Sequence, residues 1–140
     1  MSDTIPSSAI SMAGAQKVLA AALAKADEIG LDACIAICDP GGHPVLTARM
    51  DGAPILSLTI ANDKAYSVIA FKGMPTHAWW GAIENEPALV HGITKTDRLI
   101  VFGGGVGLRA GGGLVGGIGV SGGSAEQDQS IAEAGAAALT

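Results

Sequence analysis

The chain has 140 residues, of which 49% are apolar and only 15% charged, and its net charge is −5. A chain of this length is expected to form one domain that buries roughly 68–70% of its unfolded surface, and its low charge content favours an oligomer. The composition argues against nucleic-acid binding, because no basic stripe with aromatic residues is present, and against a membrane span, because no apolar run approaches roughly 20 residues.

The first half of the chain is predicted to contain a helix and a β-hairpin. Residues 1–7 are expected to form a tail, and because it lacks the basic and apolar segments of a signal peptide we expect a cytoplasmic protein. Residues 8–140 are expected to form a single domain. An apolar stripe predicts a helix over residues 7–29 that ends at Gly30, and strands over 33–38 and 45–50 flank the turn Asp39-Pro-Gly-Gly.

The two cysteines lie within the first predicted strand. Cys34 and Cys38 would share one face of that strand, about 13 Å apart at roughly 3.3 Å per residue. A disulfide needs Cα atoms within about 7 Å of each other. The sequence therefore predicts two buried, unpaired thiols.

The second half is predicted to add helices and then strands. A helix is expected over residues 54–73, Thr76 is expected to cap a shorter helix that reaches Glu84, and an irregular connection follows over 87–97. Strands are expected at 99–102 and 114–121, with further pairing near Leu108, a hairpin loop at 111–113, and a final helix opened by the capping box Ser124-Ala-Glu-Gln127. This order predicts an α+β fold in which helices pack on an antiparallel sheet of about five strands.

Glycine is concentrated in the last third of the chain, where 12 of the 21 glycines lie between Gly103 and Gly123. Glycine allows another backbone or a flat ligand to approach a strand where a Cβ would collide. We therefore expect tight turns, and either a ligand slot or a second subunit against these strands.

Two familiar motifs occur in unsuitable contexts. Gly119-Val-Ser121-Gly-Gly123 matches a nucleophile elbow, but every histidine precedes that serine, contrary to the chain order of α/β-hydrolases. Gly105-Val-Gly107-Leu-Arg-Ala110 matches a dinucleotide fingerprint, but three glycines stand where that fold needs a helix. Neither motif is expected to carry the function.

The segment Met74-Pro-Thr-His-Ala-Trp-Trp80 is the most suggestive for ligand binding. It combines a thioether, a hydroxyl, an imidazole and two indoles, and histidine is a common ligand of haem iron. The alternative is a helix start packed by indoles at a subunit contact. Arg49 would suit a carboxylate ligand or would pair with Asp51 on the surface.

Several blocks in register extend this pattern over residues 8–139. They are Asp39-Pro-Gly-Gly, Arg49-Met-Asp-Gly-Ala, Asp63-Lys-Ala-Tyr66, Phe71 to Thr76, Phe102-Gly-Gly-Gly-Val106, and Val115 to Asp128. With them the chain resembles the GlcG/HbpS-like family, which includes the C-terminal domains of PduO-type proteins. The resemblance implies a profilin-like sandwich, assembly into octamers, haem binding in some members, and a link to small-molecule catabolism.

The chain departs from the family pattern at two positions. Met74 stands where the family often has arginine, and Gly107 where it often has proline. Both positions flank the expected pocket, so contacts with haem propionates or substrate are expected to differ. Carried over residue by residue, the resemblance implies haem contacts at Thr76 and His77.

Three functions follow from these observations. In the first, the protein binds haem through Thr76, His77, Arg49 and Met74, with His77 as the metal ligand. In the second, it is a small isomerase, lyase or hydratase with a cleft between the second helix and the glycine-rich strands, and its acid and base are drawn from Lys64, Tyr66, His77 and Glu84. In the third, it is a non-catalytic assembly module whose glycines serve a subunit contact.

Overall fold

The computed structural model describes all 140 residues and contains six helical segments and four strands. The elements in chain order are α1 (Met12–Ile29), β1 (Cys34–Cys38), β2 (Pro44–Arg49), α2 (Leu56–Ala70), the 3-10 turn η1 (Thr76–Ala78), α3 (Trp79–Ile83), α4 (Pro87–Ile93), β3 (Gly105–Ala110), β4 (Gly113–Ser121) and α5 (Ala125–Ala136).

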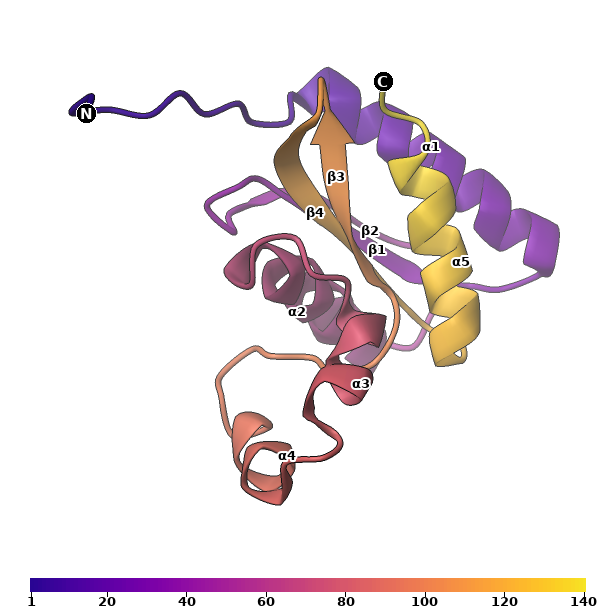
Figure 1. Ribbon diagram of the computed structural model, residues 1–140. Coiled ribbons are helices and arrows are strands. Elements are labelled where there is room, and N and C mark those ends of the chain that lie inside the picture. Colours follow the sequence, from indigo (N-terminus) through magenta and orange to yellow (C-terminus); the bar gives the residue numbers. More distant parts are fainter.

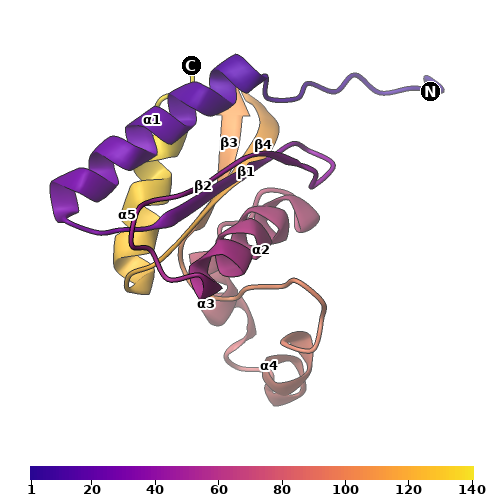
Figure 2. The same cartoon turned by 180° about the vertical axis from the view of Figure 1, so that it is seen from behind.

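The strands form one antiparallel sheet in the order β2-β1-β4-β3. Helices α1 and α5 cover one face of the sheet and α2 covers the other, while α3 and α4 extend away from the sheet beyond α2 (Figures 1 and 2). This arrangement confirms the predicted profilin-like α+β sandwich. None of the helices combines the length and the apolar character that crossing a membrane would need.

The sheet has four strands instead of about five, because residues 99–102 form no strand. The backbone of this segment is held by a side chain of α2. Ser67 Oγ accepts a hydrogen bond from the Ile100 N–H at 2.9 Å and lies 3.0 Å from the Arg98 carbonyl oxygen. Groups engaged in this way are not free for a strand ladder, and the strand begins only at Gly105.

Two hydrophobic layers hold the sandwich together. Large aliphatic side chains fill the space between the sheet and α1 and α5, whereas small residues fill the space under α2. The first layer includes Val18, Ile35, Ile37, Leu108, Ile118, Val120 and Ile131, and the second consists of Cys34, Ala36, Cys38, Ala53, Ala61 and Ala65. Both cysteines are buried and free, as predicted.

The small residues of the second layer allow α2 to lie with its backbone directly on the glycine-rich strands. A Cβ at Gly117 would come within 2.7 Å of the Ala65 carbonyl oxygen, one at Gly105 within 2.8 Å of the Lys64 carbonyl oxygen, and one at Gly119 would overlap the Ala61 carbonyl oxygen. The expected cleft between the second helix and these strands is therefore wrong, because α2 occupies that space. The larger hollows lie elsewhere, one of them (about 430 Å³) between α1 and β2.

Local signals set the helix ends and the hairpin. Ser124 and Gln127 form the predicted capping box, Gly30 adopts a left-handed conformation (φ 71°) after α1, and Gly111 and Gly112, both with positive φ, form the loop between β3 and β4. Two boundaries were predicted wrongly. Helix α1 begins at Met12, because Ser11 Oγ accepts the Gly14 N–H, and part of the expected irregular connection is α4, which starts with Pro87.

Candidate functional site

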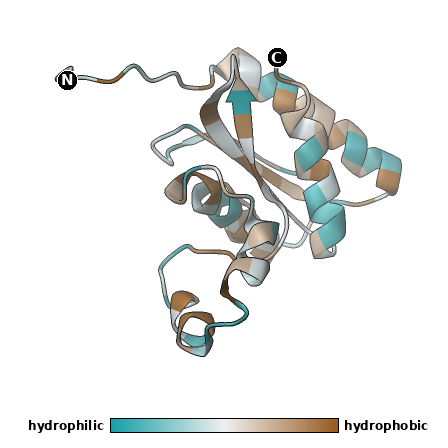
Figure 3. Ribbon diagram, viewed as in Figure 1, coloured by the Kyte–Doolittle hydropathy of each residue, from teal (hydrophilic) through white to brown (hydrophobic).

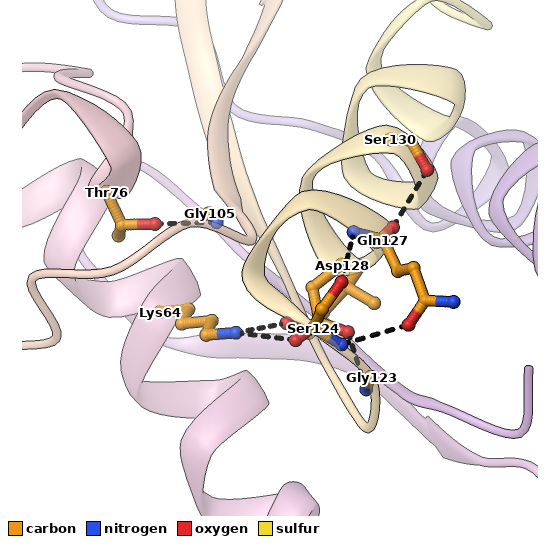
Figure 4. Close-up of polar contacts among 9 residues, drawn as sticks. Lys64, Thr76, Gly105, Gly123, Ser124, Gln127, Asp128 and Ser130 are labelled. Carbon is orange, nitrogen blue, oxygen red and sulfur yellow. Dashed lines mark hydrogen bonds and ion pairs between the residues drawn. The ribbon is translucent and has the colours of Figure 1, made fainter.

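A buried ion pair lies where α2, β4 and α5 meet (Figure 4). The Lys64 ammonium on α2 lies 3.0 Å from Asp128 Oδ2 on α5 and donates to the Val120 carbonyl oxygen at 2.7 Å. The side chains of Lys64 and Asp128 are only 1% and 4% exposed. Asp128 Oδ1 also accepts the Gly123 N–H at 2.9 Å. The pair therefore ties α2 to the start of α5.

Two opposing influences act on the charge of the Lys64 ammonium. Burial lowers the pKa of the Lys64 ammonium, and the Asp128 carboxylate opposes that change. The ring of Phe102 lies above the ammonium, with its centroid 5.1 Å from Nζ, at a distance suited to a cation–π contact. Gly104 leaves room for this contact, because a Cβ there would come within 2.6 Å of Nζ.

Thr76 forms a second link to the same turn. Its Oγ1 accepts a hydrogen bond from the Gly105 N–H at 2.9 Å, as Figure 4 shows. The residue is completely buried. The expectation that Thr76 caps a helix is wrong, because η1 begins after Pro75 without a side-chain cap and the hydroxyl is used on β3. Thr76 positions the turn before β3, and its contact with a ligand stays a prediction.

Next to this link lies an exposed surface that we call the η1 face, defined by Phe71, His77, Trp80 and Phe102. Phe71, Trp80 and Phe102 are 54%, 56% and 48% exposed, which is unusual for such large apolar side chains. His77 is exposed, and its Cβ lies 3.4 Å from the position that a Cβ of Gly103 would take. His77 is thus exposed in the same short segment as Trp80 and lies against Gly103, the residue that follows Phe102.

Trp79 supports the η1 face from within. It is 6% exposed and stacks at a tilt against Phe71, with ring centroids 5.0 Å apart. Its Nε1–H is buried and has no hydrogen-bond acceptor. An indole N–H normally finds an acceptor when it is buried, and this donor has none within the chain.

The other proposed acid–base residues do not converge with His77. The Tyr66 ring packs against Gly42 and under the Arg98 guanidinium, 4.0 Å from the ring centroid, and Arg98 pairs with Asp63 at 2.9 Å. Glu84 is exposed just after α3. With Lys64 buried in its ion pair, the four residues do not form one catalytic cluster.

The two remaining predicted cofactor contacts lie at different places. Arg49 donates to the Ala53 carbonyl oxygen at 3.3 Å and ends β2, at the opposite edge of the sheet from β3. Three strand spacings of about 4.8 Å separate these edges, and a contact between Arg49 and a ligand stays a prediction. Met74 is half-buried in the turn that leads to Thr76.

Comparison with known proteins agrees with this fold. Residues 10–137 match the family model described as haem degrading protein HbpS-like. The chain is 35% identical over 136 residues to the corrinoid adenosyltransferase PduO of Citrobacter freundii; this covers 96% of the chain but only 40% of PduO.

Two solved structures show the same architecture. The Klebsiella pneumoniae protein ORFY superposes with a TM-score of 0.91 at 34% identity, covering 99% of this chain and 95% of that one. A PduOC:heme complex superposes with a TM-score of 0.84 at 32% identity, covering 94% and 96%. Because the family model spans nearly the whole domain, the chain belongs to the haem degrading protein HbpS-like family.

Proposed function

We propose that this protein binds haem on the η1 face, with His77 as the axial ligand of the iron. The observation that carries the proposal is that His77 is exposed, as are the large rings of Phe71, Trp80 and Phe102 in the adjoining segments. Histidine is a common axial ligand of haem, and apolar and aromatic side chains suit the flat body of a macrocycle. The structural likeness to a PduOC:heme complex supports the same ligand.

The donor set favours haem over a bare metal ion. No three His, Cys, Asp or Glu side chains come together that could hold a metal ion. A metal at His77 would therefore have to arrive with other ligands of its own, as iron does in a porphyrin. When bound, haem supplies iron for ligand exchange and redox chemistry; the chain supplies His77 and the surrounding apolar surface.

Two buried contacts hold this face in place and act as positioning groups. The Thr76–Gly105 hydrogen bond fixes η1 on β3, and the Lys64–Asp128 pair lies beneath Phe102. The catalytic alternative has less support, because α2 fills the cleft in which it was expected to operate.

We also propose that the protein is a homo-oligomer. Helix α4 has no buried residue although it is largely apolar, as its brown segments in Figure 3 show. Ile55 and Leu56 are also strongly exposed. A second copy would cover such surfaces, and light scattering of the purified protein measures the subunit number. The octamer, the cytoplasmic location and the catabolic link remain predictions.

The function is tested by titrating the purified protein with haemin and following the Soret band. We expect saturable binding that His77→Ala weakens strongly, while the matched changes His43→Ala and His91→Ala leave it unchanged. Absence of saturable binding to the wild-type protein would refute the function. Equal loss in all three variants would refute the assignment of His77.

A further inference from the structure

The turn between α2 and η1 contains an unusual backbone conformation. Lys72 adopts a left-handed conformation (φ 59°), and Arg98 is the only other non-glycine residue with positive φ. Helices commonly end in this conformation, but the residue there is usually glycine, since a Cβ makes it unfavourable. Lys72 thus occupies a position at which glycine would be more stable, and its side chain is carried there at a cost in backbone energy.

Arg109 reaches the same turn from the sheet. The pairing of β3 with β4 is irregular between Leu108 and Arg109, and such bulges redirect side chains. The Arg109 guanidinium lies against Gly73, so that a Cβ on Gly73 would come within 2.9 Å of Nη2. The guanidinium therefore lies beside the residue that follows Lys72.

These two cations have no acidic partner. The four ion pairs of the structure join Lys25 to Glu28, His43 to Asp39, Lys64 to Asp128, and Arg98 to Asp63. Lys72 and Arg109 are both exposed. A chain with a net charge of −5 thus carries two unpaired positive residues at one turn, which follows the exposed Phe71 in the chain.

The turn connects these cations to His77 along the edge strand. His77 lies against Gly103, Thr76 is bonded to Gly105, and Gly73 packs on Gly107, whose Cβ would lie 3.5 Å from the Gly73 carbonyl oxygen. Gly105 to Gly107 cover about 7 Å along β3 at 3.3 Å per residue, and Gly103 lies just before the strand. His77 and the Gly73 turn therefore lie along the same edge of the sheet.

We infer that Lys72 and Arg109 form the anion-binding end of the η1 face and bind the carboxylates of the flat ligand whose iron His77 holds. This inference rests on the proposed function and adds its second point of recognition. Arg109 supplies a planar fork suited to a carboxylate, and Lys72 supplies a mobile point charge. It also reassigns the carboxylate contact from Arg49, which ends the strand at the opposite edge of the sheet.

The inference is tested with two ligands that differ only in their carboxylates, haemin and haemin dimethyl ester. The wild-type protein is expected to bind haemin about tenfold or more tightly than the ester, since hydrogen bonds between charged groups are the strong ones. Lys72→Gly and Arg109→Gln should each weaken haemin binding several-fold, by roughly the margin of one such contact, and leave ester binding nearly unchanged. Lys17→Gln on α1 removes one exposed charge elsewhere and should change neither affinity.

Thermal unfolding distinguishes a loss of ligand recognition from a loss of protein stability. Lys72→Gly should raise the melting temperature while it weakens haemin binding, because glycine relieves the left-handed conformation. If Lys72 and Arg109 only shape the turn, their variants would change the affinity for haemin and for its ester to the same extent. That result, or equal affinity of the wild-type protein for haemin and its ester, would overturn the inference while His77-dependent binding still upheld the function. No haemin binding by the wild-type protein would refute both.

Discussion

The buried Lys64–Asp128 pair gives the sharpest prediction about stability. Asp128→Ala leaves the ammonium buried with the Val120 carbonyl oxygen and the Phe102 ring as its remaining contacts. Lys64→Met leaves the carboxylate buried with the Gly123 N–H. Each single change thus strands one charge in the interior, which is more costly than the net stabilisation that the intact pair supplies.

The magnitude follows from the burial of the pair. Removing one partner of a buried ion pair costs about 3–5 kcal/mol, and both side chains are almost inaccessible to solvent. Domains are typically stable by about 5–15 kcal/mol, so each single variant should lose at least about a fifth of the total. The double variant Lys64→Met/Asp128→Leu removes both charges and should be more stable than the sum of the two single losses predicts.

Urea unfolding followed by circular dichroism measures these differences from the midpoints at constant slope. The exposed pair Lys25–Glu28 is the matched control, since Glu28 is 69% exposed and its pair is 3.5 Å long; Glu28→Ala should cost less than about 0.5 kcal/mol. Losses below about 1 kcal/mol in both single variants, or strict additivity in the double variant, would show that the pair is not buried and coupled as described.

Three further predictions concern other parts of the fold. Gly119→Ala should destabilise the protein by several kcal/mol or prevent folding, because the added Cβ would overlap the α2 backbone. Gly81→Ala has open space around the added Cβ and should stabilise the protein by roughly 0.5–1 kcal/mol. Equal effects of the two changes in urea unfolding would contradict the packing of α2 on the sheet. Burial raises the pKa of the Cys38 thiol from 9.0 to about 11. The neutral thiol therefore contributes at most about 3 kcal/mol to the free energy of unfolding, fully below pH 9 and progressively less as the pH rises to 11. Cys38→Ala should lose less stability than the wild-type protein between pH 9 and 11, and an unchanged pH slope would contradict the burial of this thiol. Thr76→Val should lower the free energy of unfolding by about 1–3 kcal/mol, because it leaves the Gly105 N–H of β3 without its acceptor. Thr76→Ser keeps the hydroxyl and should lower it much less. Similar losses in the two variants would show that the effect comes from packing and not from the hydrogen bond.

Local structure could be predicted from the sequence where neighbouring residues decide it. The capping box at Ser124 and the left-handed Gly30 depend on contacts within a few residues, and both were predicted correctly. The start of α1 and the helix α4 were missed, because Ser7 and Ser11 are equally good caps by type and Pro87 is compatible with either a loop or a helix start.

Contacts between residues far apart in the chain could not be predicted from local sequence patterns. Asp128 lies in the first turn of α5, where a carboxylate is favoured by the helix dipole, yet its main partner is Lys64, 64 positions earlier in the chain. The glycines were correctly expected to permit close approach, but the approaching backbone is α2. Knowing which element lies on which face of the sheet requires the topology.

The candidate site was predicted in part. The segment that contains His77 and both tryptophans was singled out by composition, and the structure leaves His77 and Trp80 exposed. Phe102 was not assigned to it, because its contact with Lys64 joins segments separated in sequence. The one sequence feature that could have indicated a role for Phe102 in the site is its position directly before the glycine run 103–105.

The most direct test of the account is a protein in which His77 is the only histidine, made by His43→Gln and His91→Gln. Both changes lie outside the η1 face, so the haemin complex should keep the wild-type Soret maximum and affinity. If the single-histidine protein gave the absorption spectrum of unligated haemin, the central claim would be contradicted. It would also be contradicted if His77→Ala, introduced alone into the wild-type protein, left the spectrum of the haemin complex unchanged.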